Sequence, residues 1–160
     1  NFAAKVATAI VREREKTPFE TTLQLSEFIK RVIGGKPSPK HKATRCFQAL
    51  RIAVNGELDE LKKALESSID VLADDGRLCV ISFHSLEDRI VKTFIKDKSQ
   101  GQKIPNGLPI TFEEAEKMRL AKAKVEPVGG AIKATPEEIA ANVRSRSATL
   151  RICKRLKRLP

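Results

Sequence analysis

The fold of this chain is decided at residues 74–89, which read DDGRLCVISFHSLEDR. The stretch opens with turn residues, continues as an apolar run from Leu78 to Phe83, and then changes abruptly to polar residues. The run is too short for a helix and too uniformly apolar for a half-exposed strand. It predicts a strand that is buried on both faces.

A helix is expected directly after this strand. Ser85 and Asp88 have the spacing of a capping box, and Leu86, Ile90 and Phe94 then recur every four residues, so the helix should begin at about Leu86. In an open α/β sheet, ligands bind where strands end and helices begin. The polar residues of this junction are therefore the first candidates for a functional site: Ser82, His84, Ser85, Glu87, Asp88 and Arg89.

Two common kinds of site do not fit the junction. A serine nucleophile on a sharp turn needs small residues around it, which Phe83 and Leu86 are not. A metal centre would need more ligands than His84, Asp88 and the distant His41. The sequence therefore predicts neither a hydrolase nor a metal site. A purely structural role, as helix cap and surface charges, stays open, although a histidine at the end of a strand favours function.

Length and composition limit the classes of protein to which the chain can belong. With 160 residues, of which 41% are hydrophobic and 32% charged, the chain is long enough for one ordinary globular domain. No apolar run approaches the roughly 18 residues of a membrane helix, and no signal peptide is recognisable, so a cytoplasmic protein is expected. The chain starts with Asn1 inside a helical pattern, which suggests a piece of something longer.

The net charge of +11 favours a polyanionic partner such as nucleic acid, the alternative being a solvated basic surface. Trp and Tyr are absent and most of the seven Phe occupy core-like positions, so we expect phosphate contacts from Arg and Lys rather than aromatic stacking. The scattered cysteines Cys46, Cys79 and Cys153 are interpreted as small hydrophobic residues.

Two amphipathic helices begin the chain. Phe2, Val6 and Ile10 place the first over the first dozen residues, and a capping box of Thr21 with Gln24 starts the second. A loop follows at 36–42. From 44 to 72, apolar residues at intervals of three or four predict one helix of about seven turns, in which Gly56 costs about 1 kcal/mol relative to Ala. A polar stripe, either a solvated flank or a functional surface, lines its first half: Arg45, Gln48, Arg51 and Asn55.

The rest of the chain alternates short elements. After the helix to about 98 come a loop at 101–109, a short helix to about 120, a weak strand candidate at 122–128, a helix at 136–142 and a half-buried strand in which Leu150 and Ile152 alternate with Thr149 and Arg151. This order is typical of the closing half of a doubly wound sheet.

Two arginines stand immediately before the last strand. Arg144 and Arg146 could bind phosphate or pair with Glu87 or Asp88, and the sequence does not separate these alternatives. Neither glycine pair follows a strand and opens a helix, so the chain has no nucleotide cradle of its own.

Three stretches together resemble a known family: 41–58 (HKATRCFQALRIAVNGEL), 76–92 (GRLCVISFHSLEDRIVK) and 142–151 (NVRSRSATLR). In order and spacing they are similar to the C-terminal half of the bacterial 16S ribosomal RNA cytosine-N4 methyltransferases, which use S-adenosylmethionine. The resemblance runs from about Asn1 to Cys153. Cys46 and Val143 depart from it, because Thr and Pro are expected there.

The resemblance implies an α/β fold: the C-terminal part of a Rossmann-like class I methyltransferase sheet, about three strands, with a helical insertion subdomain. Residues 1–43 would belong to the substrate-recognition insertion and 44–160 to the sheet domain, with the N-terminal half of the sheet absent. The glycine-rich cofactor loop would lie upstream of Asn1. No cofactor-binding residue is therefore expected in this chain, which should be inactive alone and should not bind S-adenosylmethionine unaided.

The resemblance also implies roles for the candidate residues. Ser82, His84 and Asp88 would be the catalytic candidates, holding the Watson–Crick edge of an extruded cytosine. The RNA-binding candidates are Arg45, Gln48, Arg51, Asn55, Arg89, Arg144 and Arg146. The expected partner is 16S ribosomal RNA or the small ribosomal subunit, and a homodimer could cover the exposed edge of a half-sheet. The alternative function is a non-catalytic RNA- or partner-binding module.

Overall fold

The computed structural model describes residues 2–35, 41–101 and 110–157. The chain divides into two compact units, Asn1–Glu57 and Leu58–Pro160. The domain boundary expected after residue 43 came from the resemblance and stays a prediction. Most of the loop expected at 36–42 and of that at 101–109 lies outside the described residues. No helix in the described ranges is long and apolar enough to cross a membrane.

The first unit contains three helices, α1 (Phe2–Lys16), α2 (Thr22–Ile33) and α3 (Thr44–Asn55). The predicted capping box at the start of α2 is confirmed: Thr21 Oγ1 accepts from the Gln24 N–H at 3.2 Å, and Gln24 Oε1 accepts from the Thr21 N–H at 3.1 Å. Buried Val6, Ile29 and Ala43 form its core. Ile29 is completely buried, which accounts for the apolar stripe of α2.

The single long helix predicted for 44–72 is wrong. Helix α3 ends at Asn55, and α4 (Glu57–Val71) begins two residues later. Gly56 between them has φ 60° and ψ 26°, and its N–H donates to the carbonyl of Ile52. This left-handed conformation costs other residues about 1–2 kcal/mol, so Gly56 is a helix stop rather than a weak helical residue.

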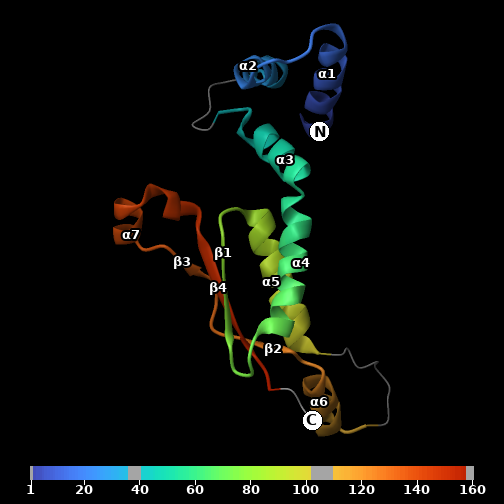
Figure 1. Ribbon diagram of the computed structural model, residues 1–160, viewed down its shortest axis with the longest axis vertical. Helices are drawn as coiled ribbons and strands as arrows, with labels where there is room; N and C mark the ends of the chain where they lie inside the picture. Colours follow the sequence, from blue (N-terminus) through green and yellow to red (C-terminus); the bar gives the residue numbers. More distant parts are fainter. Residues whose placement is uncertain (1, 36–40, 102–109, 158–160) are drawn as a thin grey trace. The chain divides into compact units, whose positions relative to one another are not determined.

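The second unit is an α/β structure whose strands all pair antiparallel. After α4 come β1 (Arg77–Ser82), α5 (Ser85–Gln100), α6 (Phe112–Ala121), β2 (Val125–Pro127), β3 (Ile132–Lys133), α7 (Pro136–Ala141), the 3-10 helix η1 (Val143–Ser147) and β4 (Thr149–Arg155). The sheet order is β1-β4-β2, and β3 also pairs with β4 (Figure 1). The short strand β3 was not predicted.

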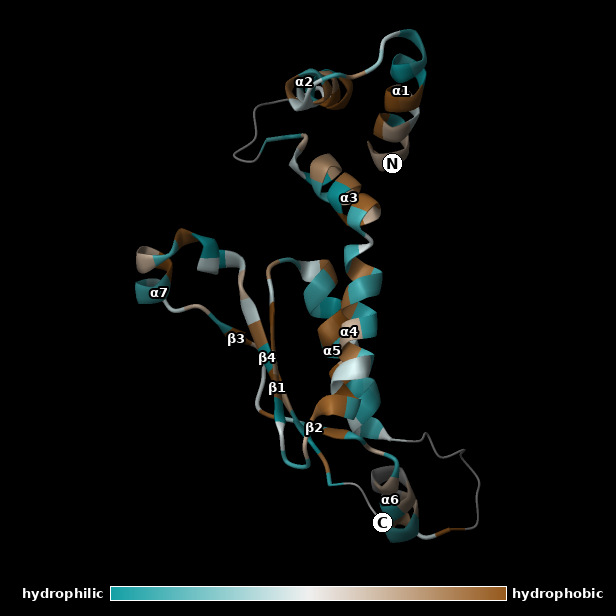
Figure 2. Ribbon diagram, in the orientation of Figure 1, coloured by the Kyte–Doolittle hydropathy of each residue, from teal (hydrophilic) through white to brown (hydrophobic). Residues whose placement is uncertain are grey.

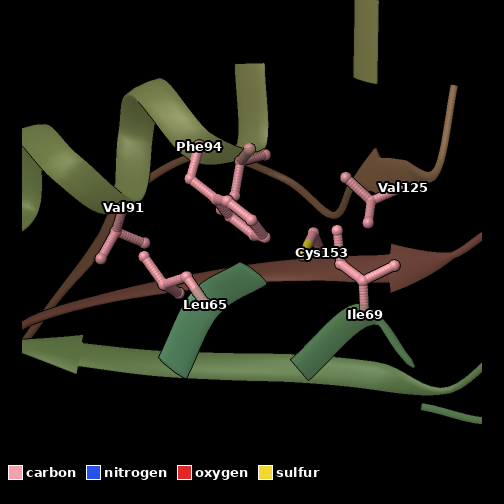
Figure 3. Close-up of a cluster of buried hydrophobic side chains, with 7 residues drawn as sticks. Leu65, Ile69, Val91, Phe94, Val125 and Cys153 are labelled. Atoms are coloured by element: carbon pink, nitrogen blue, oxygen red, sulfur yellow. The ribbon is translucent and has the colours of Figure 1, made fainter. Parts of the chain in front are cut away.

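Helices α4 and α5 supply the core against one face of this sheet. Figure 3 shows Leu65 and Ile69 of α4 converging with Val91 and Phe94 of α5 on Cys153 and Val125 of the sheet. Cys153 is completely buried and Val91 is 1% exposed. Burying side chains of this size stabilises a fold by about 1.5–3 kcal/mol each, so this cluster is the main stabilising element of the unit.

The opposite face is open, and two predictions about it are wrong. Strand β1 is not buried on both faces, because Cys79 is exposed and Ile81 is 59% exposed. In β4 the buried and exposed faces are the reverse of those expected. Thr149 is buried, whereas Leu150 and Ile152 are only half-buried. The register pairs Ile81 with Leu150 and Cys79 with Ile152, so apolar residues line the open face. Figure 2 shows the apolar stretches along β1 and β4.

The turn before β1 holds the strand in place. Asp75 has φ 63°, and its N–H donates to the Arg155 carbonyl at 3.1 Å, while the Arg155 N–H donates to the Gly76 carbonyl at 2.8 Å. A Cβ atom on Gly76 would lie 2.8 Å from the Ala73 carbonyl oxygen. The glycine is therefore required by a close backbone approach, which fixes where β1 begins opposite the end of β4.

Candidate functional site

The junction between β1 and α5 is closed by His84 rather than by Ser85. His84 Nδ1 accepts from the Glu87 N–H at 3.4 Å, and Glu87 Oε2 accepts from the N–H groups of His84 at 3.3 Å and Phe83 at 2.9 Å. The capping box predicted for Ser85 and Asp88 is wrong by one residue. Consequently Asp88 is available for another partner.

The cap also constrains the histidine ring. Since Nδ1 accepts a hydrogen bond, the proton of the neutral imidazole belongs on Nε2. Nε2 is buried and lies 3.3 Å from Glu87 Oε1, but the angles do not make a hydrogen bond. In this arrangement His84 can donate through Nε2 and cannot act as a base without giving up the helix cap.

Asp88 pairs with Arg151 of β4. The guanidinium donates from Nε to Oδ1 at 2.7 Å and from Nη2 to Oδ2 at 3.0 Å, a bidentate pair that is largely screened from solvent. The hydrogen bonds from Arg151 hold the pKa of the Asp88 carboxyl below its usual value, with a smaller contribution from the charge of Lys133. The same pairing raises the pKa of Arg151. Asp88 is therefore a charged, fully engaged carboxylate.

Ser82 lies directly across the strand pair from Thr149. Both residues are 4% exposed, and Ser82 Oγ donates to the Thr149 carbonyl at 3.3 Å. Lys133 Nζ of β3 donates to the Thr149 hydroxyl. These contacts join β1, β4 and β3 at one end of the sheet, so the Ser82 hydroxyl retains only its acceptor capacity for a ligand.

The structure thus brings the three catalytic candidates Ser82, His84 and Asp88 to one end of β1, and adds partners that sequence reasoning missed: Glu87 as cap partner, Lys133, Thr149 and Arg151. The Glu87 role could have been found from its position three residues after His84. Arg151 could not, because its partner depends on the pairing of β1 with β4.

Arg144 and Arg146 are exposed on η1. Of the two carboxylates with which they might have paired, Asp88 binds Arg151 and Glu87 accepts within the α5 cap. Of the stripe on α3, Arg51 donates twice to the Glu57 carboxylate at 2.8 and 3.1 Å, and Asn55 Nδ2 donates to it at 3.2 Å. The other RNA-binding candidates are Arg45 and Arg89, which are exposed, and Gln48, which is half-buried. Their RNA contacts stay predictions.

A protein-family model described as the MraW methylase family matches residues 1–156. The chain belongs to the MraW methylase family. The ribosomal RNA small subunit methyltransferase H of Shewanella halifaxensis is 52% identical over 151 residues, which are 94% of this chain and 47% of that protein. The protein of the same name from Idiomarina loihiensis is 51% identical over 156 residues, 98% of this chain and 48% of the relative. This MraW-family chain therefore spans about half the length of the curated relatives it matches.

Membership of the MraW methylase family implies S-adenosylmethionine, and the β1–α5 turn is one place in the chain where part of it could bind. Such turns bind anionic groups through unpaired backbone N–H groups. Here the N–H groups of Phe83, His84 and Glu87 are all bonded within the cap. These three N–H groups are therefore not offered to a cofactor at this turn.

Proposed function

We propose that this chain is one part of an S-adenosylmethionine-dependent methyltransferase that modifies the exocyclic N4 of a cytosine in 16S ribosomal RNA. The rest of the protein would carry the cofactor site and the remainder of the sheet, and the whole would act in the cytoplasm. The carrying observation is membership of the MraW methylase family together with the polar cluster at the end of β1. On this proposal the isolated chain is inactive.

The fold proposal is the C-terminal part of a Rossmann-like class I sheet, with residues 1–43 in a helical insertion. The strand order β1-β4-β2 supports it, because β4 runs antiparallel to β1 and to β2. The open apolar face and the outer edge of β1, which pairs only with β4 among the described residues, are where further sheet and helices would pack.

Methyl transfer to cytosine N4 requires that the base be oriented, and we assign this role to the polar cluster at the end of β1. The lone pair of cytosine N4 is delocalised into the ring, so the enzyme must align this nitrogen with the methyl group that the cofactor supplies. The cofactor, held by the rest of the protein, would supply the methyl group: a C–N bond would form as the sulfonium C–S bond breaks, and N4 would give up one proton. Neither His84 nor Asp88 offers an unengaged base for this proton.

Within this role each residue has a distinct task. His84 Nε2 and Ser82 Oγ are buried, so the groups that cover them must move aside before a base can bind. The Nε2–H of His84 then donates to the acceptor edge of the cytosine, and the Ser82 oxygen accepts from the N4 amino group. Asp88 acts through Arg151, which fixes the start of α5 against β4. Phosphates or sugars of the RNA are held by Arg45, Gln48, Arg89, Arg144 and Arg146. Arg51 and Asn55 must first break their hydrogen bonds to Glu57 before they can contact RNA.

The test is nucleoside analysis after incubating the full-length protein with small ribosomal subunits or 16S ribosomal RNA and labelled S-adenosylmethionine. N4-methylcytidine is the expected product, and a different modified nucleoside would refute the proposal. Calorimetry on the isolated chain tests whether the cofactor site lies in the rest of the protein. Tight binding of S-adenosylmethionine by the isolated chain would contradict that location. A non-catalytic module would yield RNA binding with no methylation by the full-length protein.

A further inference from the structure

A lysine of the edge strand β3 contacts the polar cluster at the end of β1. Lys133 lies opposite Thr149 of β4, which in turn lies opposite Ser82 of β1. Side chains directly opposite one another on antiparallel strands share a face of the sheet. Thr149 lies on the same face of β4 as Cys153, which α4 and α5 cover. Lys133 therefore belongs to the helix-covered face and not to the open apolar face.

Lys133 reaches this position because the edge strand contains a bulge. In the register of β2, the residue opposite Thr149 would be Ala131. Extra residues between β2 and β3 place Lys133 there instead. One of them, Gly129, has φ 68°, a conformation that glycine adopts without steric cost. Bulges are common beside active sites, where they redirect side chains, and this one brings an ammonium group to the cluster in place of a methyl group.

The ammonium group of Lys133 keeps donors in reserve. Its Nζ donates to the Thr149 hydroxyl, and an ammonium group has three N–H donors. Among the residues that the structure describes, no carboxylate lies within ion-pair distance of this Nζ. Asp88 is near enough for the Lys133 charge to lower the pKa of its carboxyl, but both of its oxygens bind Arg151. Lys133 thus brings a positive charge and unused donors to the end of β1.

The place of Lys133 in the sheet indicates which anion it meets. The proposed function puts the target cytosine at Ser82 and His84, and the proposed fold attaches the cofactor-binding half at the outer edge of β1. Lys133 lies beyond β4, on the edge away from β1. The base would therefore lie between the cofactor and Lys133, and the anion on the Lys133 side would be the RNA backbone. Lysine is a common ligand for phosphate, which it binds as a compact charge.

We propose that Lys133 binds a backbone phosphate next to the target cytosine and so positions the nucleotide at the end of β1. The N–H groups that do not contact Thr149 donate to the phosphate oxygens. This inference rests on the proposed function and adds to it an RNA contact from the edge strand, on a residue outside the arginine-rich segments.

The test measures kcat and KM of the full-length protein on small ribosomal subunits. Lys133→Met keeps the aliphatic part of the side chain and removes the charge. It should raise KM about 10- to 100-fold, the scale of a hydrogen bond to a charged group, with kcat changed less than about threefold. The salt dependence of RNA affinity should fall by about one phosphate contact. Lys133→Arg should restore both quantities.

Lys124→Met is the matched control. Lys124 is an exposed lysine directly before β2, at the other end of the same sheet edge, so its loss should change neither KM nor the salt dependence. Unchanged KM and salt dependence in Lys133→Met would overturn the proposal. A lower unfolding midpoint and kcat with the wild-type salt dependence would also overturn it, because Lys133 would then only support Thr149. Weaker binding of S-adenosylmethionine with unchanged RNA affinity would assign the ammonium group to the cofactor carboxylate instead.

A neutral methylphosphonate on either side of the target cytosine in 16S ribosomal RNA identifies the phosphate. At one of these positions the wild type should lose the same factor in affinity that Lys133→Met loses, and Lys133→Met should not respond. Equal responses of the two proteins at both positions would overturn the contact. If the wild type forms no N4-methylcytidine, the proposed function fails, whereas the salt dependence and the methylphosphonate affinities still decide whether Lys133 binds an RNA phosphate.

Discussion

Asp88 on α5 and Arg151 on β4 form a bidentate ion pair, with N–O distances of 2.7 and 3.0 Å. The pair joins the first turn of the helix that follows β1 to the strand that pairs with β1. It therefore fixes the angle at which α5 leaves the sheet and, with it, the position of His84.

Replacing Arg151 by Leu should destabilise the fold. The change leaves the Asp88 carboxylate partly buried without its partner, and an unsatisfied buried acceptor costs about 1–3 kcal/mol. Urea unfolding measures the free energy. Arg146→Leu removes an exposed arginine instead and should stay within about 0.5 kcal/mol of the wild type. Equal losses in the two variants would mean that the ion pair contributes nothing specific.

The same pair predicts a dependence on acid. The pKa of Asp88 is lower in the folded chain than in the unfolded chain, so its contribution is complete above the unfolded value of about 3.9 and is lost as pH falls through the folded value. The difference in unfolding free energy between the wild type and Asp88→Asn should be constant above about pH 5 and shrink below about pH 4. A difference that does not shrink between about pH 5 and about pH 3 would contradict the assignment.

Thiol reactivity should distinguish the two faces of the sheet. Cys79 is exposed on the open face, whereas Cys153 is completely buried and its burial raises the pKa of the thiol. In the isolated chain an alkylating reagent should modify Cys79 quickly and Cys153 only on unfolding. In the full-length protein Cys79 should be protected, because the proposed fold packs the rest of the sheet domain on this face.

The control for that prediction is light scattering on the isolated chain. Protection of Cys79 in the isolated chain together with a dimeric mass would show that a second copy covers the open face. Rapid modification of Cys79 in the full-length protein would contradict the proposed packing of the remaining domain.

Gly76→Ala should weaken the turn before β1. The added Cβ would lie 2.8 Å from the Ala73 carbonyl oxygen, a backbone atom that cannot easily move, so overpacking should cost about 1–3 kcal/mol. Gly130→Ala is the matched control, since a Cβ there meets nothing within 4 Å. Thermal unfolding of both variants measures the difference. A midpoint for Gly76→Ala equal to that of Gly130→Ala would show that the turn adapts without cost.

The elements that the sequence predicts well are those specified by local signals. The Thr21–Gln24 box and the turn at Gly76 depend on residues a few positions apart, and both are found where expected. The errors arise where a local pattern is consistent with two structures. An apolar repeat continues through Gly56, and only its left-handed backbone shows that the helix stops.

The candidate site was only partly predictable for a related reason. Ser82, His84 and Asp88 were found because they lie together in the sequence. Arg151 lies 63 residues from Asp88, and its inward direction depends on the register that places it opposite Val80. The exposure of Ile81 was missed because an apolar run does not reveal which face of its sheet is covered.

The most direct test of the account is methylation by His84→Asn in the full-length protein. Asparagine is an excellent N-cap, so the variant keeps the start of α5 and removes only the imidazole donor. We predict an unchanged unfolding midpoint and a fall of about 100-fold or more in N4-methylcytidine formation, the scale of one well-placed donor. Wild-type turnover by His84→Asn would contradict the claim that the polar residues at the end of β1 take part in the reaction. His84 would then serve only as a helix cap.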